Sequence, residues 1–147
     1  MISVQKDDFN VGFEYQNLRS VSQNEGAIVF FVGLVRDMNA DGSVQAMEIE
    51  HYPGMTENVL SNIALQAKER WDLQQVKIIH RFGRLEAAEQ IVFVATSSVH
   101  REAAFAACEF IMDFLKTKAP FWKKELNDQG DVWVEAKESD ELKLTRW

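Results

Sequence analysis

The feature that most constrains the fold is an apolar run from Ala27 to Val35. The run is rich in β-branched and aromatic residues, which favour a β-strand, and no polar side chain interrupts it. This pattern predicts a strand that is buried on both faces. The run is about half as long as a membrane-spanning helix, and it contains Gly33, so we expect no membrane span.

Strand patterns recur along the rest of the chain, beginning with a short one at residues 2–5. Apolar and polar residues alternate over 44–52 and again over 132–136, as they do in half-exposed strands. Residues 76–82 place Val, Ile, His and Phe side chains on one face, and 91–96 is apolar on both faces. Each of these segments is predicted to be a strand.

Helices are predicted between these strands. Asp7 is a plausible N-cap for the first, which would carry Phe9, Phe13 and Leu18 inward. Thr56 is expected to cap the second, where apolar residues recur at helical spacing. Because strands and helices alternate, the sequence predicts one mixed domain of the α/β or α+β class.

A third, longer helix is expected from about His100 to Lys118, capped by Ser97 or Ser98 and ended by Pro120. Its solvent-facing stripe is predicted to hold Glu102, Glu109, Asp113 and Lys116.

Composition favours a globular protein with an acidic surface. A length of 147 residues predicts a single domain, 1–147, and the charged segment 138–147 is expected to be a loosely held, flexible tail. With 16 basic and 23 acidic residues, the net charge of −7 argues against general affinity for nucleic acid or acidic membranes. The single Cys excludes an internal disulfide, and the N-terminus has no signal-peptide pattern, so we expect a cytoplasmic location.

The basic residues are unevenly distributed, and one short segment contains four lysines and no acidic residue: Lys116, Lys118, Lys123 and Lys124. One interpretation is structural, since cations in the last turn of a helix interact favourably with its dipole. The other is functional. The residues after Pro120 are Phe and Trp, which predict a nonhelical aromatic turn that brings Lys116 and Lys123 together. A lysine beside other cations and aromatic walls is a better nucleophile or proton carrier.

Two further places suit an anionic ligand. His100 and Arg101 open the long helix, where free N–H groups and an adjacent Arg bind phosphate or carboxylate; a solvated Arg and a capping-region His are the alternative. Arg36 directly follows the apolar strand, a common place for ligand-binding side chains, or it is a strand-end charge that reaches water.

The spacing of these candidates limits how they combine. His100 and Lys116 are 16 residues apart, which is roughly 24 Å along one helix. One small substrate therefore touches both only if a symmetric dimer brings the two helix ends together. Otherwise they belong to separate sites.

The remaining candidates favour structural roles. His51 and His80 each lie on an apolar strand face, as core histidines do, and the histidines lack metal-ligand spacing. Cys108 shares a helix face with apolar residues and is predicted to be buried and inert. Phosphate-loop, dinucleotide and serine-hydrolase motifs are missing from the sequence.

Several segments together resemble the catalytic (large) subunit of molybdopterin synthase, over about residues 2–138. The longest is residues 111–125, IMDFLKTKAPFWKKE, and its most specific part is 116–124. The other matching segments are 26–36 (GAIVFFVGLVR), 50–56 (EHYPGMT), 79–83 (IHRFG), 98–101 (SVHR) and 131–136 (DVWVEA).

The resemblance implies an α/β hammerhead fold with an additional antiparallel β subdomain. It also implies a sulfurtransferase that converts cyclic pyranopterin monophosphate (precursor Z) to the dithiolene of molybdopterin. Sulfur would arrive as a thiocarboxylate on the C-terminal Gly-Gly of a small ubiquitin-like carrier subunit. The implied assembly is a heterotetramer with a central homodimer of large subunits, and no metal or organic cofactor is implied for the transfer.

The resemblance also implies roles for individual residues. Lys116 matches the family's essential lysine and would face the carrier's terminus and the reacting carbon, with a transient covalent adduct as one route. Lys123 would stabilise charge or transfer a proton. The substrate-binding residues would be Arg36, His100 and Arg101 on the phosphate and pterin, with Leu34, Val35, Lys124 and Glu125 beside them. Lys137 stands where an Arg is common in the family, and lysine lacks the bidentate fork that positions an anion.

Two other classes of function stay open. The chain could be a non-catalytic module that binds the tail of a ubiquitin-like protein. It could also be a Schiff-base lysine enzyme that acts on a phosphorylated carbonyl compound.

Overall fold

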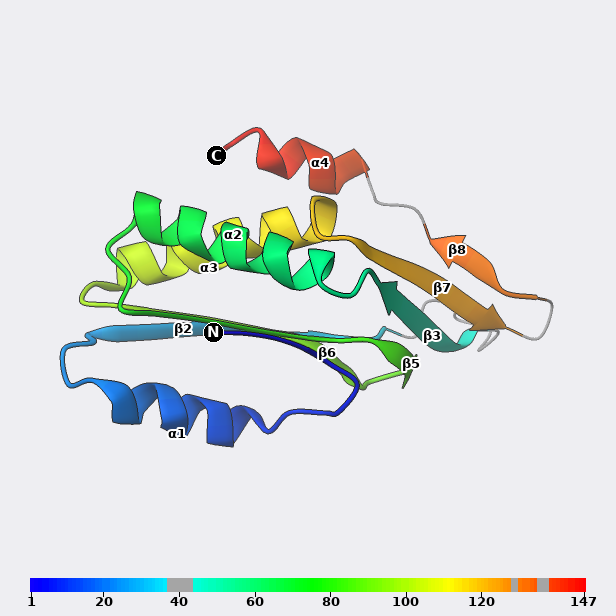
Figure 1. Cartoon of the computed structure of the whole chain (residues 1–147), viewed down its shortest axis with the longest axis horizontal. Coiled ribbons are helices and arrows are strands. Elements are labelled where there is room, and N and C mark those ends of the chain that lie inside the picture. The colour runs from blue at the N-terminus through cyan, green and yellow to red at the C-terminus, as the bar shows by residue number, and fades with distance from the viewer. Residues whose placement is uncertain (37–43, 128–129, 135–137) are drawn as a thin grey trace.

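The computed structural model describes residues 1–36, 44–127, 130–134 and 138–147, and its elements are arranged in layers (Figure 1). In chain order the elements are β1 (Ile2–Gln5), α1 (Val11–Val21), β2 (Ala27–Leu34), β3 (Val44–His51), α2 (Met55–Arg70), β4 (Gln75–Arg81), β5 (Gly83–Glu86), β6 (Gln90–Ser98), α3 (Arg101–Thr117), β7 (Phe121–Asn127), β8 (Val132–Val134) and α4 (Glu138–Leu144). The predicted mixed class is confirmed. No helix in the described ranges is long and apolar enough to cross a membrane.

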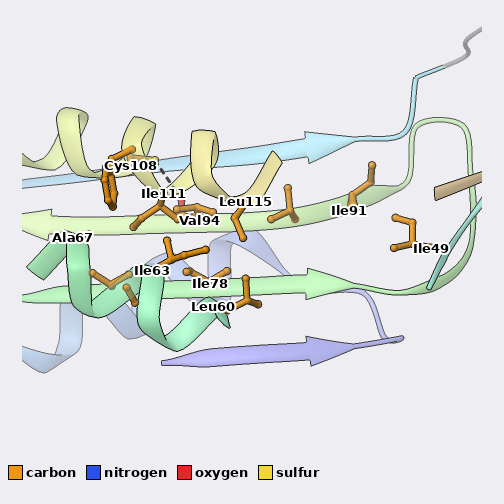
Figure 2. Close-up of a cluster of buried hydrophobic side chains, with 14 of the residues drawn as sticks. Ile49, Leu60, Ile63, Ala67, Ile78, Ile91, Val94, Cys108, Ile111 and Leu115 are labelled. Carbon is orange, nitrogen blue, oxygen red and sulfur yellow. Dashed lines mark hydrogen bonds between the residues drawn. The ribbon is translucent and has the colours of Figure 1, made fainter. Parts of the chain in front are cut away.

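The first sheet has the strand order β1-β4-β6-β2, in which β1 and β4 are parallel and the other pairs antiparallel. Helix α1 covers one face of this sheet, and α2 and α3 cover the other (Figure 1). The main core lies between the sheet and the α2–α3 layer, where Ile63 and Ile111 pack near Ile78 and Val94 (Figure 2). Phe93 points to the opposite face, in a second cluster beneath α1.

Cys108 belongs to the main core, as its helix face predicts. Its Sγ atom donates to the carbonyl oxygen of Val94 at 3.8 Å (Figure 2). Burial raises the pKa of the Cys108 thiol to about 12, so thiolate chemistry is suppressed there.

Strand β2 is less buried than the sequence predicts. It is the edge strand of the first sheet, and Phe30, Phe31 and Leu34 are 43%, 40% and 52% exposed. The prediction of burial on both faces is therefore wrong for the single chain. An apolar run indicates that a strand favours apolar surroundings. It does not indicate whether those surroundings come from the same chain or from another one.

The helices begin at other residues than predicted. Asn10 caps α1 and accepts a hydrogen bond from the Phe13 N–H at 2.9 Å, while the Phe13 side chain is 62% exposed rather than inward. The N-cap residues of the next two helices are Gly54 and His100 rather than Thr56 and a serine. The type of side chain alone did not identify which of several neighbouring residues is the N-cap.

The second sheet is antiparallel, with the order β5-β3-β7-β8, and it is the additional subdomain that the resemblance implies. Strand β7 replaces the predicted aromatic turn. Pro120 still ends α3, but Phe121 at once pairs with His51 of β3. This strand was not predicted from the sequence, because it contains three consecutive charged residues, Lys123, Lys124 and Glu125. They interrupt the alternation of apolar and polar residues by which strands are recognised.

The C-terminal segment packs against α3 and is not the loosely held tail that the sequence predicts. Helix α4 lies over α3 (Figure 1), and Arg146 and Trp147 both bind the carboxylate of Asp113. Asp113 is consequently buried, although its spacing places it on the predicted solvent stripe.

Candidate functional site

A cavity of about 530 Å³ lies where the end of β2, the C-terminal end of α3 and the start of β7 meet. Its apolar wall comes from β2, β6 and α3, with Leu34, Val92 and Leu115 among the residues. The ionisable and polar residues that line it are Arg36, His80, Lys116, Lys123, Asp140 and Lys143.

Lys116 and Lys123 line the same cavity, so the structure brings together the two lysines that the sequence singled out. Lys116 lies in the last turn of α3, and Lys123 lies on β7 just after Pro120 has ended that helix. The chain reverses between them as predicted, although it does so by entering a strand. Phe121 forms part of the wall, whereas Trp122 is not among the lining residues and is 48% exposed.

Of the residues predicted around β2, Leu34 and Arg36 line the cavity and Val35 does not. A register shift between Gly33 and Leu34 turns the end of the strand. Val35 is buried, and its N–H donates to the carbonyl oxygen of Glu89 at 2.9 Å. Val35 therefore fixes the backbone from which Arg36 projects.

Lys124 and Glu125 follow Lys123 on β7, but neither lines the cavity. The side chains of a strand alternate between its faces, which separates Lys124 from Lys123. The Lys124 ammonium lies 5.0 Å from the centre of the Trp133 ring. Lys137 lies outside the described residues.

His100 and Arg101 lie at the opposite end of α3 from Lys116, and both are exposed. His100 and Lys116 are 16 positions apart along this helix, or roughly 24 Å. The single chain therefore does not bring these two residues to the cavity.

His80 is the cavity residue that sequence reasoning assigned to the core. It is buried, and its ring stacks on Phe121 with 3.6 Å between ring centres. Burial lowers the pKa of His80 to about 3, and the positive charges of Lys123 and Lys116 add to the effect. The apolar face of β4 correctly indicated burial, but no sequence signal showed that β7 would bring lysines to it.

Asp140 and Lys143 were also missed, because they belong to α4, in the segment predicted to be loose. With them, the described lining carries one arginine, three lysines and one carboxylate, while the lowered pKa of His80 keeps its ring neutral. A half-apolar cavity with a positive surplus suits a small organic anion. Within the described ranges, no group of three His, Cys, Asp or Glu side chains is placed to hold a metal ion.

Comparison with known proteins identifies the family of the chain. The family model described as "MoaE protein" matches residues 4–118. A curated Vibrio cholerae protein named molybdopterin synthase catalytic subunit is 55% identical over 146 residues, covering 99% of this chain and 97% of the relative.

Solved structures give the same result. The MoaE protein of Burkholderia ambifaria superposes with a TM-score of 0.86 at 51% identity, covering 100% of this chain and 97% of the other. A Staphylococcus aureus structure titled molybdopterin synthase superposes with a TM-score of 0.81 at 30% identity, covering 90% and 96%. The chain therefore belongs to the MoaE protein family.

Proposed function

We propose that this chain is the catalytic subunit of a molybdopterin synthase. It transfers sulfur from the C-terminal thiocarboxylate of a small ubiquitin-like carrier subunit to cyclic pyranopterin monophosphate. The observation that carries the proposal is the cavity in which Lys116 and Lys123 face a common space lined mostly by cations and apolar groups. Family membership supplies the reaction, and the cavity supplies a place for two anions, the thiocarboxylate and the phosphate.

The lysines have distinct proposed roles. Lys116 faces the carrier's terminus and the reacting carbon, where its ammonium offsets the negative charge that develops as sulfur is transferred. Lys123, across the same cavity, stabilises charge or transfers a proton. Leu34 supplies apolar wall, and Arg36 offers a bidentate fork to the substrate phosphate.

We further propose that the site is completed by a second copy of the chain. The exposed apolar side chains of β2 favour a homodimer, within a heterotetramer that carries two carrier subunits. In such a dimer His100 and Arg101 of one copy reach the phosphate held by the other. Val35, Lys124, Glu125 and Lys137 are the remaining residues to which we assign a part in substrate binding. In this assembly residues 1–147 form one domain that acts in the cytoplasm.

A reconstituted transfer assay tests the proposal. Purified protein, thiocarboxylated carrier and precursor Z are combined, and molybdopterin is detected as its fluorescent oxidised derivative. Lys116→Ala is expected to lower product formation by about 100-fold or more while carrier binding persists. Lys118→Ala is the matched control, because Lys118 is an exposed lysine two residues away that does not line the cavity.

The same samples separate the other functions. If the chain were only a binding module, wild type would bind the carrier tightly and yield no molybdopterin. If it were a Schiff-base enzyme, borohydride would trap substrate on Lys116 without any carrier present.

A further inference from the structure

His80 is a buried titratable group that the proposed function leaves without a role. It lies on β4, is 6% exposed and lines the cavity together with Lys116 and Lys123. An imidazole that only fills space in the core would not need to line a cationic cavity. The role of His80 therefore depends on which of its ring nitrogens donates and which accepts a hydrogen bond.

The two ring nitrogens of His80 are distinguished by one contact. Nδ1 lies 2.8 Å from the carbonyl oxygen of Arg81. Because a carbonyl oxygen only accepts hydrogen bonds, Nδ1 carries the ring proton and donates it. In the neutral ring, Nε2 is then an acceptor. The stack on Phe121, with 16° between the ring planes, fixes the ring orientation.

The surroundings keep the ring neutral. Burial is the main cause of its lowered pKa, and Lys123 is the strongest of the neighbouring charges. The charges that act on the ring are Lys123 of β7, Lys116 of α3 and His51 of β3. The other charged groups that line the same cavity are Arg36 after β2, and Asp140 and Lys143 of α4. Because most of these groups are cations, the neutral ring can act on them as a hydrogen-bond acceptor, through the lone pair of Nε2.

Strand β7 brings Lys123 to the cavity that this ring lines. Phe121 and Lys123 are two residues apart, so their side chains leave the same face of the strand. We propose that His80 is a positioning residue for Lys123: its Nε2 atom accepts a hydrogen bond from the Lys123 ammonium and holds that charge in the cavity. The catalytic meaning of this contact rests on the proposed function, whereas the contact itself can be tested without it.

The first test follows the titration of Lys123 by the NMR shift of its Cε atom, assigned by its loss in Lys123→Arg. A hydrogen bond to a neutral acceptor stabilises the ammonium form, so losing the acceptor lowers the lysine pKa. His80→Phe, which retains an aromatic ring for the stack, is expected to lower the midpoint by about one pH unit, a tenfold change in proton affinity. His80→Gln, which has an acceptor, is expected to restore part of the shift.

A matched variant and a measurement on wild type complete this test. His51→Phe removes a neighbouring strand histidine that packs at a tilt against the Phe82 ring, and it should leave the Lys123 midpoint unchanged. In wild type, long-range ¹H–¹⁵N spectra should show His80 protonated on Nδ1. Protonation on Nε2, or an unchanged Lys123 midpoint in folded His80→Phe, would overturn the proposal.

The transfer assay adds a catalytic readout once wild type has been shown to make product. His80→Phe should lower kcat by about tenfold with carrier binding unchanged, and the alkaline limb of its pH profile should move to lower pH. A pH profile identical to that of wild type would mean that His80 serves only in packing. If wild type makes no product, the proposed function fails, and the NMR titration still decides whether His80 holds Lys123.

Discussion

Asp113 and Arg146 join the C-terminal segment to α3 through one carboxylate oxygen. The Oδ2 atom of Asp113 accepts hydrogen bonds from Arg146 Nη2 at 2.7 Å and Nε at 3.1 Å. The same oxygen accepts a third from Trp147 Nε1 at 2.6 Å, and the Trp147 ring packs edge-on against Trp71 and Phe110. This contact anchors α4, which brings Asp140 and Lys143 to the cavity wall.

Replacing Asp113 is therefore expected to release the tail. Asp113→Ala leaves the Trp147 N–H without its acceptor, and we expect a loss of about 1–3 kcal/mol in the free energy of unfolding. Urea unfolding measures the loss, and hydrogen exchange should show lower protection in α4 than in α2. Glu109→Ala is the control, because its 2.8 Å pair with Arg146 is exposed and is worth about 0.5 kcal/mol. Equal effects of the two variants would contradict the assigned role of Asp113.

Arg81 makes a second anchor, between β4 and the segments on either side of it. Its buried guanidinium donates to the carbonyl oxygens of Lys6 at 3.1 Å and Gln90 at 2.9 Å. Arg81→Ala is expected to lower the free energy of unfolding by about 3 kcal/mol, because two charge-assisted hydrogen bonds are lost. Arg84→Ala, at an exposed position on β5, should change it by less than about 0.5 kcal/mol. Thermal and urea unfolding of the two variants provide the comparison.

The sequence predicted those elements whose patterns depend on their own residues. The helical spacing of α2 and α3 and the apolar content of β6 identified these elements directly. Strand β7 was not predicted because pairing with β3, at least 70 residues earlier in the chain, makes this segment a strand despite its run of charged side chains. Asp113 was predicted to face solvent for a related reason: the residue that covers it, Trp147, lies at the other end of a long sequence separation.

The candidate site divides in the same way. Lys116 and Lys123 are close in sequence, and the helix-ending Pro120 made their proximity predictable. His80 reaches them only because β4 and β7, in different sheets, meet at the stack between His80 and Phe121. No periodicity within one segment reports a contact between two sheets.

The lowered pKa of His80 predicts how stability depends on pH. The folded pKa is about 3 and the ordinary value is 6.5, so below pH 6.5 the unfolded chain binds a proton that the folded chain excludes. Stability is therefore lost as pH falls from 6.5 toward 3. Between pH 6.5 and 5 this residue should account for about 1.5 kcal/mol. Urea unfolding of wild type and His80→Phe at the two values measures it: the variant should lose less stability than wild type, and parallel losses would refute the assignment.

Arg36 supplies the last prediction, which concerns the substrate phosphate. A guanidinium donates two parallel hydrogen bonds to a phosphate, whereas the ammonium of lysine acts as a point charge. If Arg36 holds the phosphate in ground and transition states alike, Arg36→Lys should raise the KM for precursor Z about tenfold and leave kcat within about twofold. Arg84→Lys, at an exposed position on β5 that is not part of the cavity lining, should leave both constants unchanged. Steady-state kinetics with saturating carrier separates the two constants. A fall in kcat at constant KM would instead place Arg36 against the reacting carbon, because only a contact made in the transition state lowers kcat and kcat/KM together.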